Sequence, residues 1–162
     1  MGRGLHSSHF KDLQMQLTPN LLTSLCKTAV AAGSSDITDA TVVDMAGYDG
    51  VRFIFSFGAI TTGAVTSVAA AGKDTNSPTP GTDDLEGSKI TVADSGDDTL
   101  YILDIFQPRQ RYVRPFVKRA TQNAVLNCII AERYNHNGKL PITQDATVTD
   151  QKLKVSPAVG TA

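Results

Sequence analysis

The chain has no tryptophan, two cysteines and three histidines among its 162 residues. Cys26 and Cys128 each lie inside an apolar run, which is typical of buried free thiols that pack as small hydrophobic side chains. A disulfide would need oxidising surroundings and close Cβ atoms, and neither follows from the sequence. Without histidines at ligand spacing, the two cysteines do not predict a zinc site. We interpret His6 and His9 as solvated tail residues, and His136 as a solvated residue of an Asn/Gly turn.

The sequence also lacks an excess of charge and a long apolar run. The formal net charge is −1 at pH 7, so no global attraction to nucleic acid or to an anionic membrane is expected. No stretch of about 18 apolar residues is present, which predicts no membrane span. The N-terminal stretch lacks the apolar centre of a signal peptide, so we expect a product that stays in the cytoplasm of the cell that makes it.

Recognisable catalytic motifs are missing as well. No GxSxG, HExxH, P-loop or GxGxxG arrangement occurs, which predicts a protein that is not an enzyme and uses no cofactor. Acidic residues gather in two places: Asp83-Asp84-Glu86 and Asp94-Asp97-Asp98. Such clusters could offer oxygen ligands to Ca²⁺, but neither has EF-hand spacing, and we interpret both as solvated, with no metal. The first cluster lies in a long polar loop, residues 73–87, and loops of this length are commonly functional or mobile.

The sequence does contain a series of β-type runs. The clearest begins at Val51, where Phe53, Phe55 and Phe57 alternate with other residues, and this period of two is the signature of a strand with one buried face. The other candidate strands cover residues 27–32, 37–45, 62–71, 89–93, 99–106, 111–118 and 124–134. Seven to eight strands, with no convincing amphipathic helix, predict an all-β fold: a β-sandwich or jelly roll with extended N- and C-terminal arms.

Turn chemistry adds three expectations about connections and boundaries. Pro108 and a linker of about four residues predict a hairpin between strands 99–106 and 111–118. Pro115 has no N–H group, so the second of these strands is expected to be an edge strand or to be bulged there. Polar composition at both ends predicts a flexible N-terminal arm at 1–16, a sandwich domain at 17–138 and an extended C-terminal arm at 139–162.

A basic cluster is the one charged feature above background. Five of the fifteen basic residues fall within eleven positions, with two aromatic residues between them: Arg109, Arg111, Tyr112, Arg114, Phe116, Lys118 and Arg119. Three interpretations stay open. The cluster could bind nucleic acid through phosphates and stacked bases. It could be a strand whose charges only deter strand addition. It could also be a protein–protein interface, in which arginine and tyrosine are favoured.

The segment LYILDIFQPRQRYVRPFVKRATQNAVLNCIIAERY, residues 100–134, resembles small structural proteins of tailed bacteriophages. The run RYVRPFVKR, with a strand before it and another after it, carries the resemblance. The upstream order is similar too: VVDMAGYDGVRFIFSFG, then a strand of small residues, then a loop. Together they resemble the capsid cement, or head decoration, proteins over about residues 28–134.

This resemblance implies a jelly-roll or sandwich protein without catalytic residues, located on the capsid surface of a virion after synthesis in the host cytoplasm. Its implied partners are the major capsid protein and further copies of itself, as a dimer or trimer. The residues expected at the interface are Arg109, Arg111, Tyr112, Arg114, Lys118 and Arg119. Two other functions stay open: a head-completion or tail ring component, and a single-stranded nucleic-acid-binding module, which the acidic whole chain disfavours.

Overall fold

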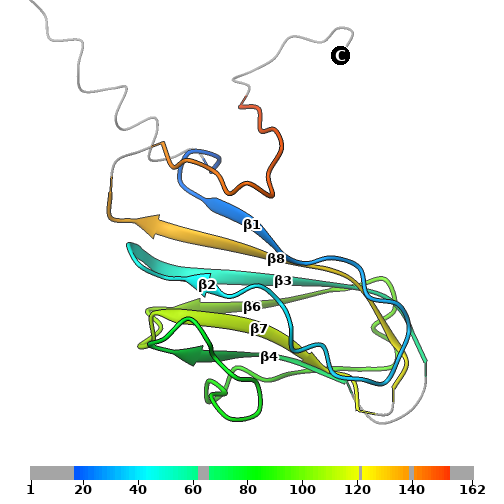
Figure 1. The fold of residues 1–162 in the computed structure, drawn as a ribbon. Coiled ribbons are helices and arrows are strands. Elements are labelled where there is room, and N and C mark those ends of the chain that lie inside the picture. The colour runs from blue at the N-terminus through cyan, green and yellow to red at the C-terminus, as the bar shows by residue number, and fades with distance from the viewer. Residues whose placement is uncertain (1–16, 62–65, 121, 139–140, 154–162) are drawn as a thin grey trace, which may run out of the picture.

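The computed structural model describes residues 17–61, 66–120, 122–138 and 141–153. Within these ranges all regular structure is β, and none of it is helix (Figure 1). The strands are β1 (Leu22–Lys27), β2 (Val43–Asp44), β3 (Tyr48–Ile60), β4 (Thr66–Lys73), β5 (Ile90–Val92), β6 (Leu100–Phe106), β7 (Tyr112–Lys118) and β8 (Ala124–His136).

These strands form two four-stranded antiparallel sheets. Sheet A has the order β1-β8-β3-β6, and sheet B has the order β2-β7-β4-β5. The pairs β1 with β8, β2 with β7, β3 with β6 and β4 with β5 are those of one long hairpin rolled up into two layers. This pairing pattern defines a jelly roll, an architecture that viral capsid domains, lectins and cupins share. The predicted all-β fold is therefore confirmed.

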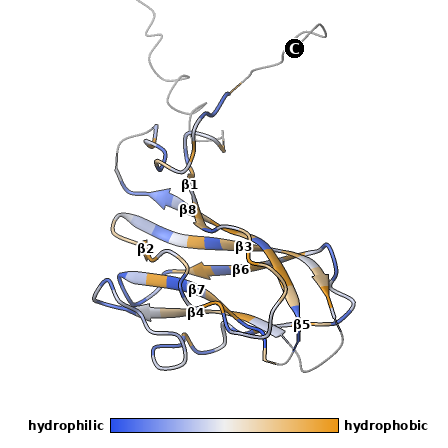
Figure 2. Ribbon diagram, turned by 45° about the vertical axis from the view of Figure 1, so that its right-hand side comes forward, coloured by the Kyte–Doolittle hydropathy of each residue, from blue (hydrophilic) through white to orange (hydrophobic). Residues whose placement is uncertain are grey.

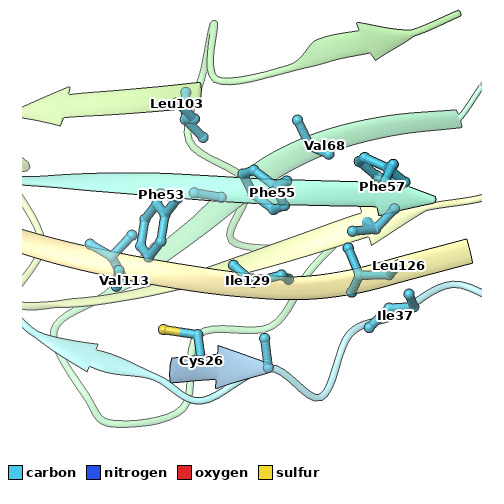
Figure 3. Packing of buried hydrophobic residues seen from close by; sticks show 14 of the residues in the cluster. Cys26, Ile37, Phe53, Phe55, Phe57, Val68, Leu103, Val113, Leu126 and Ile129 are labelled. Atoms are coloured by element: carbon cyan, nitrogen blue, oxygen red, sulfur yellow. The ribbon is translucent and has the colours of Figure 1, made fainter. Parts of the chain in front are cut away.

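The core lies between the two sheets, and β3 contributes its largest side chains. Phe53, Phe55 and Phe57 are fully buried, as the alternation in the sequence predicted. They meet valines of sheet B, such as Val68 and Val113, and aliphatic residues of the neighbouring β8 (Figure 3). Burial of each large apolar side chain contributes roughly 1.5–3 kcal/mol, so this layer accounts for much of the stability that holds the sheets together.

The linker at 107–110 does not form the predicted hairpin. It joins β6 of sheet A to β7 of sheet B, so the two strands are neighbours in sequence but belong to different layers. Gln107 takes a positive φ of 50°, and its N–H donates to the carbonyl of Asp49 at 2.6 Å. Because β3 already pairs with β6 and β4 with β7, each strand is held by partners distant in sequence, and the proline turn only redirects the chain between sheets.

β7 is neither an edge strand nor bulged at Pro115, because it lies between β2 and β4 and pairs with β4 without a register shift. The predicted strand 37–45 is reduced to the two residues of β2 plus a single bridge from Ile37 to Val117. The backbone groups of Arg111 and Val117 bond to Met45 and Ile37, on the β2 side of β7. Every second residue of a strand bonds to the same side, so the nitrogen of Pro115 also faces the β2 side. Between the Ile37–Val117 bridge and β2, no strand residue pairs with β7 on this side. The missing N–H group of Pro115 therefore costs no ladder hydrogen bond.

The chain ends of the described part lie near each other beside β1 (Figure 1). The predicted N-terminal arm at 1–16 falls outside the described residues. Residues 141–153 contain no strand, and they follow the free edge of β1. Gln144 accepts from the N–H of Thr23 at 3.0 Å and donates to the carbonyl of Leu21 at 2.6 Å. Thr147 accepts from the N–H of Leu25 at 3.0 Å, so polar side chains occupy this sheet edge.

The long polar loop after β4 folds back on sheet B. It lies beside β4, on the side away from β3, in both Figure 1 and Figure 2. The N–H of Gly72 donates to the carbonyl of Asp83 at 2.9 Å, and the N–H of Leu85 donates to the carbonyl of Ala70 at 2.9 Å. The loop therefore continues the edge that β5 begins, and its backbone is bonded to the sheet.

Candidate functional site

The predicted interface residues belong to β7 and to the chain on either side of it. Along β7 the side chains alternate: Val113 and Val117 enter the core, while Tyr112, Arg114 and Lys118 lie on the outer face of sheet B. A strand places successive side chains on opposite faces, so these three residues share one surface. The sequence predicted this alternation correctly.

Arg109 and Arg111 mark the start of this surface. Both line an open hollow of about 380 Å³ at the end of the sandwich, together with Met45, Tyr48 and Gln110. Arg109 is exposed, and among the described residues it makes no hydrogen bond or ion pair. It is therefore free to meet a partner.

Arg111, by contrast, is engaged. Its guanidinium donates two hydrogen bonds to the carboxylate of Asp44, Nε to Oδ1 at 3.0 Å and Nη2 to Oδ2 at 2.8 Å. This hydrogen-bonded pair lowers the pKa of Asp44. The guanidinium carbon also lies 5.0 Å from the centre of the Tyr112 ring. Arg111 thus presents a cation that is fixed in position by one carboxylate and one aromatic face.

Arg114 and Lys118 occupy the rest of the surface and are both partly exposed. Arg114 donates a long bond of 3.4 Å to the carbonyl of Thr38, and its buried Nε has no partner in the described part of the chain. The Lys118 ammonium lies 5.6 Å above the Phe116 ring and 3.8 Å from the Asp84 carboxylate. We define the cationic face as Arg109, Arg111, Tyr112, Arg114 and Lys118.

Phe116 faces outward by parity but is only 1% exposed. It forms a small second cluster with Ala69 and Ala71 of β4, separate from the main core. A hollow of about 120 Å³ beside it is lined by the loop residues Leu85 and Ser88, among others. A ring buried in this way cannot stack on a nucleic-acid base, which removes one of the two aromatic platforms that the nucleic-acid interpretation requires.

Arg119 does not belong to the cationic face. Only 5% exposed, it donates to the carbonyls of Ala31, Ser35 and Ala124 at 2.6–3.0 Å. Desolvation lowers the pKa of its guanidinium. Arg119 therefore holds the chain after β1 against the start of β8, and its expected place at an interface is corrected. Arg119 is an even number of residues from Val113 and Val117, which enter the core, and this spacing in the sequence indicated an inward position.

The cysteines differ from each other in a way the sequence did not indicate. Both are free thiols. Cys26 is buried as predicted, and desolvation raises its pKa to about 12. Cys128, expected to be buried, is partly exposed. It pairs across the strands with Ser56 on the outer face of sheet A, because a register shift in β8 between the partners of Ser56 and Phe57 turns it outward.

Carboxylates of the acidic clusters accept hydrogen bonds from backbone N–H groups of their own loop or of a nearby strand end. The carboxylate of Asp83 accepts from the N–H of Thr79 at 2.8 Å, which lowers its pKa, and Asp84 accepts from the N–H of Gly81 at 2.6 Å. Asp97 accepts from the N–H of Ile60 at 2.6 Å. Across the described ranges, no three His, Cys, Asp or Glu side chains are grouped as metal ligands, and no helix could span a membrane. His136 is not the solvated turn residue that was predicted: it is the last residue of β8, is partly buried, and its ring centre lies 4.7 Å from that of Tyr48.

Comparisons with known proteins give structural likenesses at low sequence identity. No protein-family profile matches the chain, and no curated protein sequence matches it significantly. One similar structure comes from disulfide-linked pili that form Bacillus endospore appendages: it has 8% identity, covers 73% of this chain and 90% of that chain, and has a TM-score of 0.42. Another is the coat protein of Tobacco streak virus, with 11% identity, 83% and 99% coverage and a TM-score of 0.33. At these scores neither likeness carries an argument about function.

Proposed function

We propose that this chain is a virion structural protein that binds the outside of a bacteriophage capsid and stabilises the shell. The observation that supports it most is the cationic face: Tyr112, Arg114 and Lys118 on the outer face of sheet B, with Arg109 and Arg111 at the adjoining end of the sandwich. Arginine and tyrosine are enriched at protein interfaces, where arginine forks match carboxylates. The resemblance of residues 28–134 to cement proteins supports the same role, with the major capsid protein as partner and the capsid surface as location.

Binding through this face favours an acidic protein surface over a nucleic acid. Phe116 is covered, and Tyr112 already holds the guanidinium of Arg111 5.0 Å from its ring. Two aromatic rings that are both occupied leave no open stacking platform for bases. An acidic protein patch needs only the cations, and many such contacts over a capsid lattice add by avidity.

The test is co-sedimentation of the purified chain with undecorated phage capsids. Saturable binding at a fixed ratio per capsid subunit is expected. The double variant Arg109→Glu/Lys118→Glu should bind about tenfold more weakly, since each exposed ion pair contributes up to about 1 kcal/mol. Neither residue is buried, so the fold should be kept, with a loss of less than about 1 kcal/mol in the free energy of unfolding from the broken Lys118–Asp84 pair.

Lys152→Glu is the matched control, because it makes the same charge change at an exposed site on the C-terminal segment. It should bind as the parent does. Absence of saturable binding would overturn the capsid proposal, and a ring of defined size in solution would then favour a tail or head-completion component. Salt-sensitive binding to single-stranded oligonucleotides would favour the nucleic-acid alternative instead.

A further inference from the structure

The outer face of sheet A carries an uninterrupted aliphatic row. Cross-strand pairing aligns one residue from each of the four strands: Leu25 with Ile130, Ile130 with Ile54, and Ile54 with Ile102. Leu25 is 36% exposed and Ile102 is 51% exposed, and the two central isoleucines are partly exposed. The row is therefore open to solvent, unlike Phe116 of sheet B, which is only 1% exposed. We call these four residues the aliphatic row.

The next row along the strands is charged, and its central members have opposite signs. It runs from Thr23 through Glu132 and Arg52 to Asp104. Arg52 donates to Glu132 through Nε at 2.9 Å and also through Nη2. The positive charge is therefore on β3 and the negative charge on β8, the two strands on either side of the midline of the sheet.

This pattern is complementary to itself. Consider a second copy whose sheet A stacks on that of the first, related by a two-fold axis parallel to the strands and midway between β8 and β3. In this arrangement β3 of one copy lies over β8 of the other, and β6 lies over β1. Arg52 then faces Glu132 of the second copy, and Ile54 faces its Ile130. Ile102 of β6 faces Leu25 of β1. Sheets stack face to face about 10 Å apart, with nearly aligned strands.

We propose that sheet A is the interface of a symmetric dimer, formed by stacking the aliphatic row and the charged row of one copy on those of another. A two-fold contact must use the same patch on both subunits, and this face meets that requirement in both apolar and charged positions. The face measures about 20 by 24 Å from strand spacing and rise. That footprint is below the roughly 800 Å² per partner of a standard interface, so a concentration-dependent dimer is expected. The proposal does not depend on capsid binding.

Cys128 supplies a natural probe of this arrangement. It lies on β8 in the row next to the aliphatic row, beside the proposed axis. In the stacked dimer the two Cys128 Cα atoms would be about 11 Å apart, from one strand spacing and one sheet spacing. A short bismaleimide should therefore link two copies through this residue. Cys26 is buried and should not react, and Cys128→Ser should abolish the cross-link.

The decisive experiment uses charge substitutions at the two ends of the aliphatic row. Sedimentation equilibrium of the full chain should show a monomer–dimer equilibrium. Ile102→Asp and Leu25→Lys, each alone, should shift it to monomer, because each places an unpaired charge against an apolar partner. The double variant Ile102→Asp/Leu25→Lys should recover the dimer. Within one copy these residues lie three strand spacings apart, about 14 Å, so the recovery requires contact between copies.

Leu153→Asp is the control, because it replaces another exposed leucine that belongs to neither the aliphatic row nor the charged row, and it should leave the dimer unchanged. A parent chain that is monomeric at all concentrations would overturn the proposal. So would a dimer that persists in both single variants, or a double variant that stays monomeric. A further test compares the reaction of Cys128 with a thiol reagent before and after removal of residues 1–16. If a monomeric parent reacts only after the removal, the N-terminal segment and not a second copy occupies the face, and the proposal is wrong.

Discussion

The outer faces of the two sheets arise from the same alternation of side chains along the strands, but they differ in chemical character. Sheet B presents cations and the ring of Tyr112, while its other described outward ring, Phe116, is only 1% exposed. Sheet A presents the aliphatic row, and β6 adds two further exposed apolar side chains: Leu100 is 61% exposed and Phe106 is 60% exposed. On sheet B, Leu85 and Ser88 of the segment after β4 line the hollow beside Phe116. On sheet A, Leu17 and Leu21 line a hollow with Arg52 and Glu132 of the charged row, and the aliphatic row stays partly exposed.

This comparison shows that facing outward and being exposed are separate properties. A strand decides which face a side chain takes, and other segments decide whether water reaches it. Contiguous exposed apolar patches are uncommon on proteins that act alone, and they commonly mark interaction sites. The two faces therefore offer two chemically distinct surfaces, one cationic and one aliphatic.

The largest expected effect is on the free energy of unfolding, and it distinguishes a buried outward side chain of sheet B from an exposed one of sheet A. Phe116→Ala should lower the free energy of unfolding by about 3–5 kcal/mol, as for a core aromatic. Ile102→Ala should change it by less than about 0.5 kcal/mol in dilute solution, as for a surface site. Urea denaturation of both variants measures this. Equal effects would mean that the covered and open faces do not differ energetically.

A second contrast lies within the basic cluster. Arg119→Ala removes a buried guanidinium and leaves three carbonyls without their donor, so a loss of about 2–3 kcal/mol is expected. Lys118→Ala removes a partly exposed ammonium and should cost less than about 1 kcal/mol. Thermal or urea denaturation distinguishes them. A small loss at Arg119 would return it to the set of candidate interface residues.

A third prediction concerns the charged row of sheet A at high pH. Tyr134 of β8 lies across Gly50, where no Cβ could fit, and donates to Asp104 of β6 at 2.6 Å. Burial and this bond raise the pKa of Tyr134 from 10.0 to about 12. The neutral phenol is thus favoured by folding, and its contribution is full below pH 10 and lost as pH rises toward 12.

The variant Tyr134→Phe should lose about 1 kcal/mol at neutral pH and show a shallower fall in stability between about pH 10 and 12. Urea midpoints measured across this range provide the test. Tyr48→Phe is a useful comparison, since the Tyr48 pKa is also raised by burial but without a carboxylate partner. An unchanged alkaline slope in Tyr134→Phe would contradict the assigned bond.

The smallest effect belongs to the exposed pair on the cationic face. The bonds from Arg111 lower the pKa of Asp44, so their contribution is full above the ordinary value of 3.8 and is lost as pH falls below it. Arg111→Ala should lower the unfolding midpoint only slightly at neutral pH and not at all in strong acid, because the pair is solvent-exposed. Acid titration of the unfolding midpoint measures the difference. A constant offset at every pH would point to lost packing instead.

The sequence alone determined the local periodicity of the strands and, through it, the face that each side chain takes. Alternation along β3 predicted a buried Phe53, Phe55 and Phe57, and alternation along β7 predicted which side carries Tyr112 and Arg114. These are consequences of strand geometry, in which a side chain's face depends only on its position. The same rule already placed Arg119 on the inward side, although its charge favoured the opposite interpretation.

The tertiary structure alone decided which strands pair and which surfaces are covered. Residues 107–110 looked like a hairpin turn, but they connect two sheets because the partners of β6 and β7 come from β3 and β4. The aliphatic row unites Leu25, Ile54, Ile102 and Ile130, which no local pattern groups together. Pairing and cover depend on contacts between residues far apart in the chain, and periodicity, which is a property of neighbours, carries no information about them.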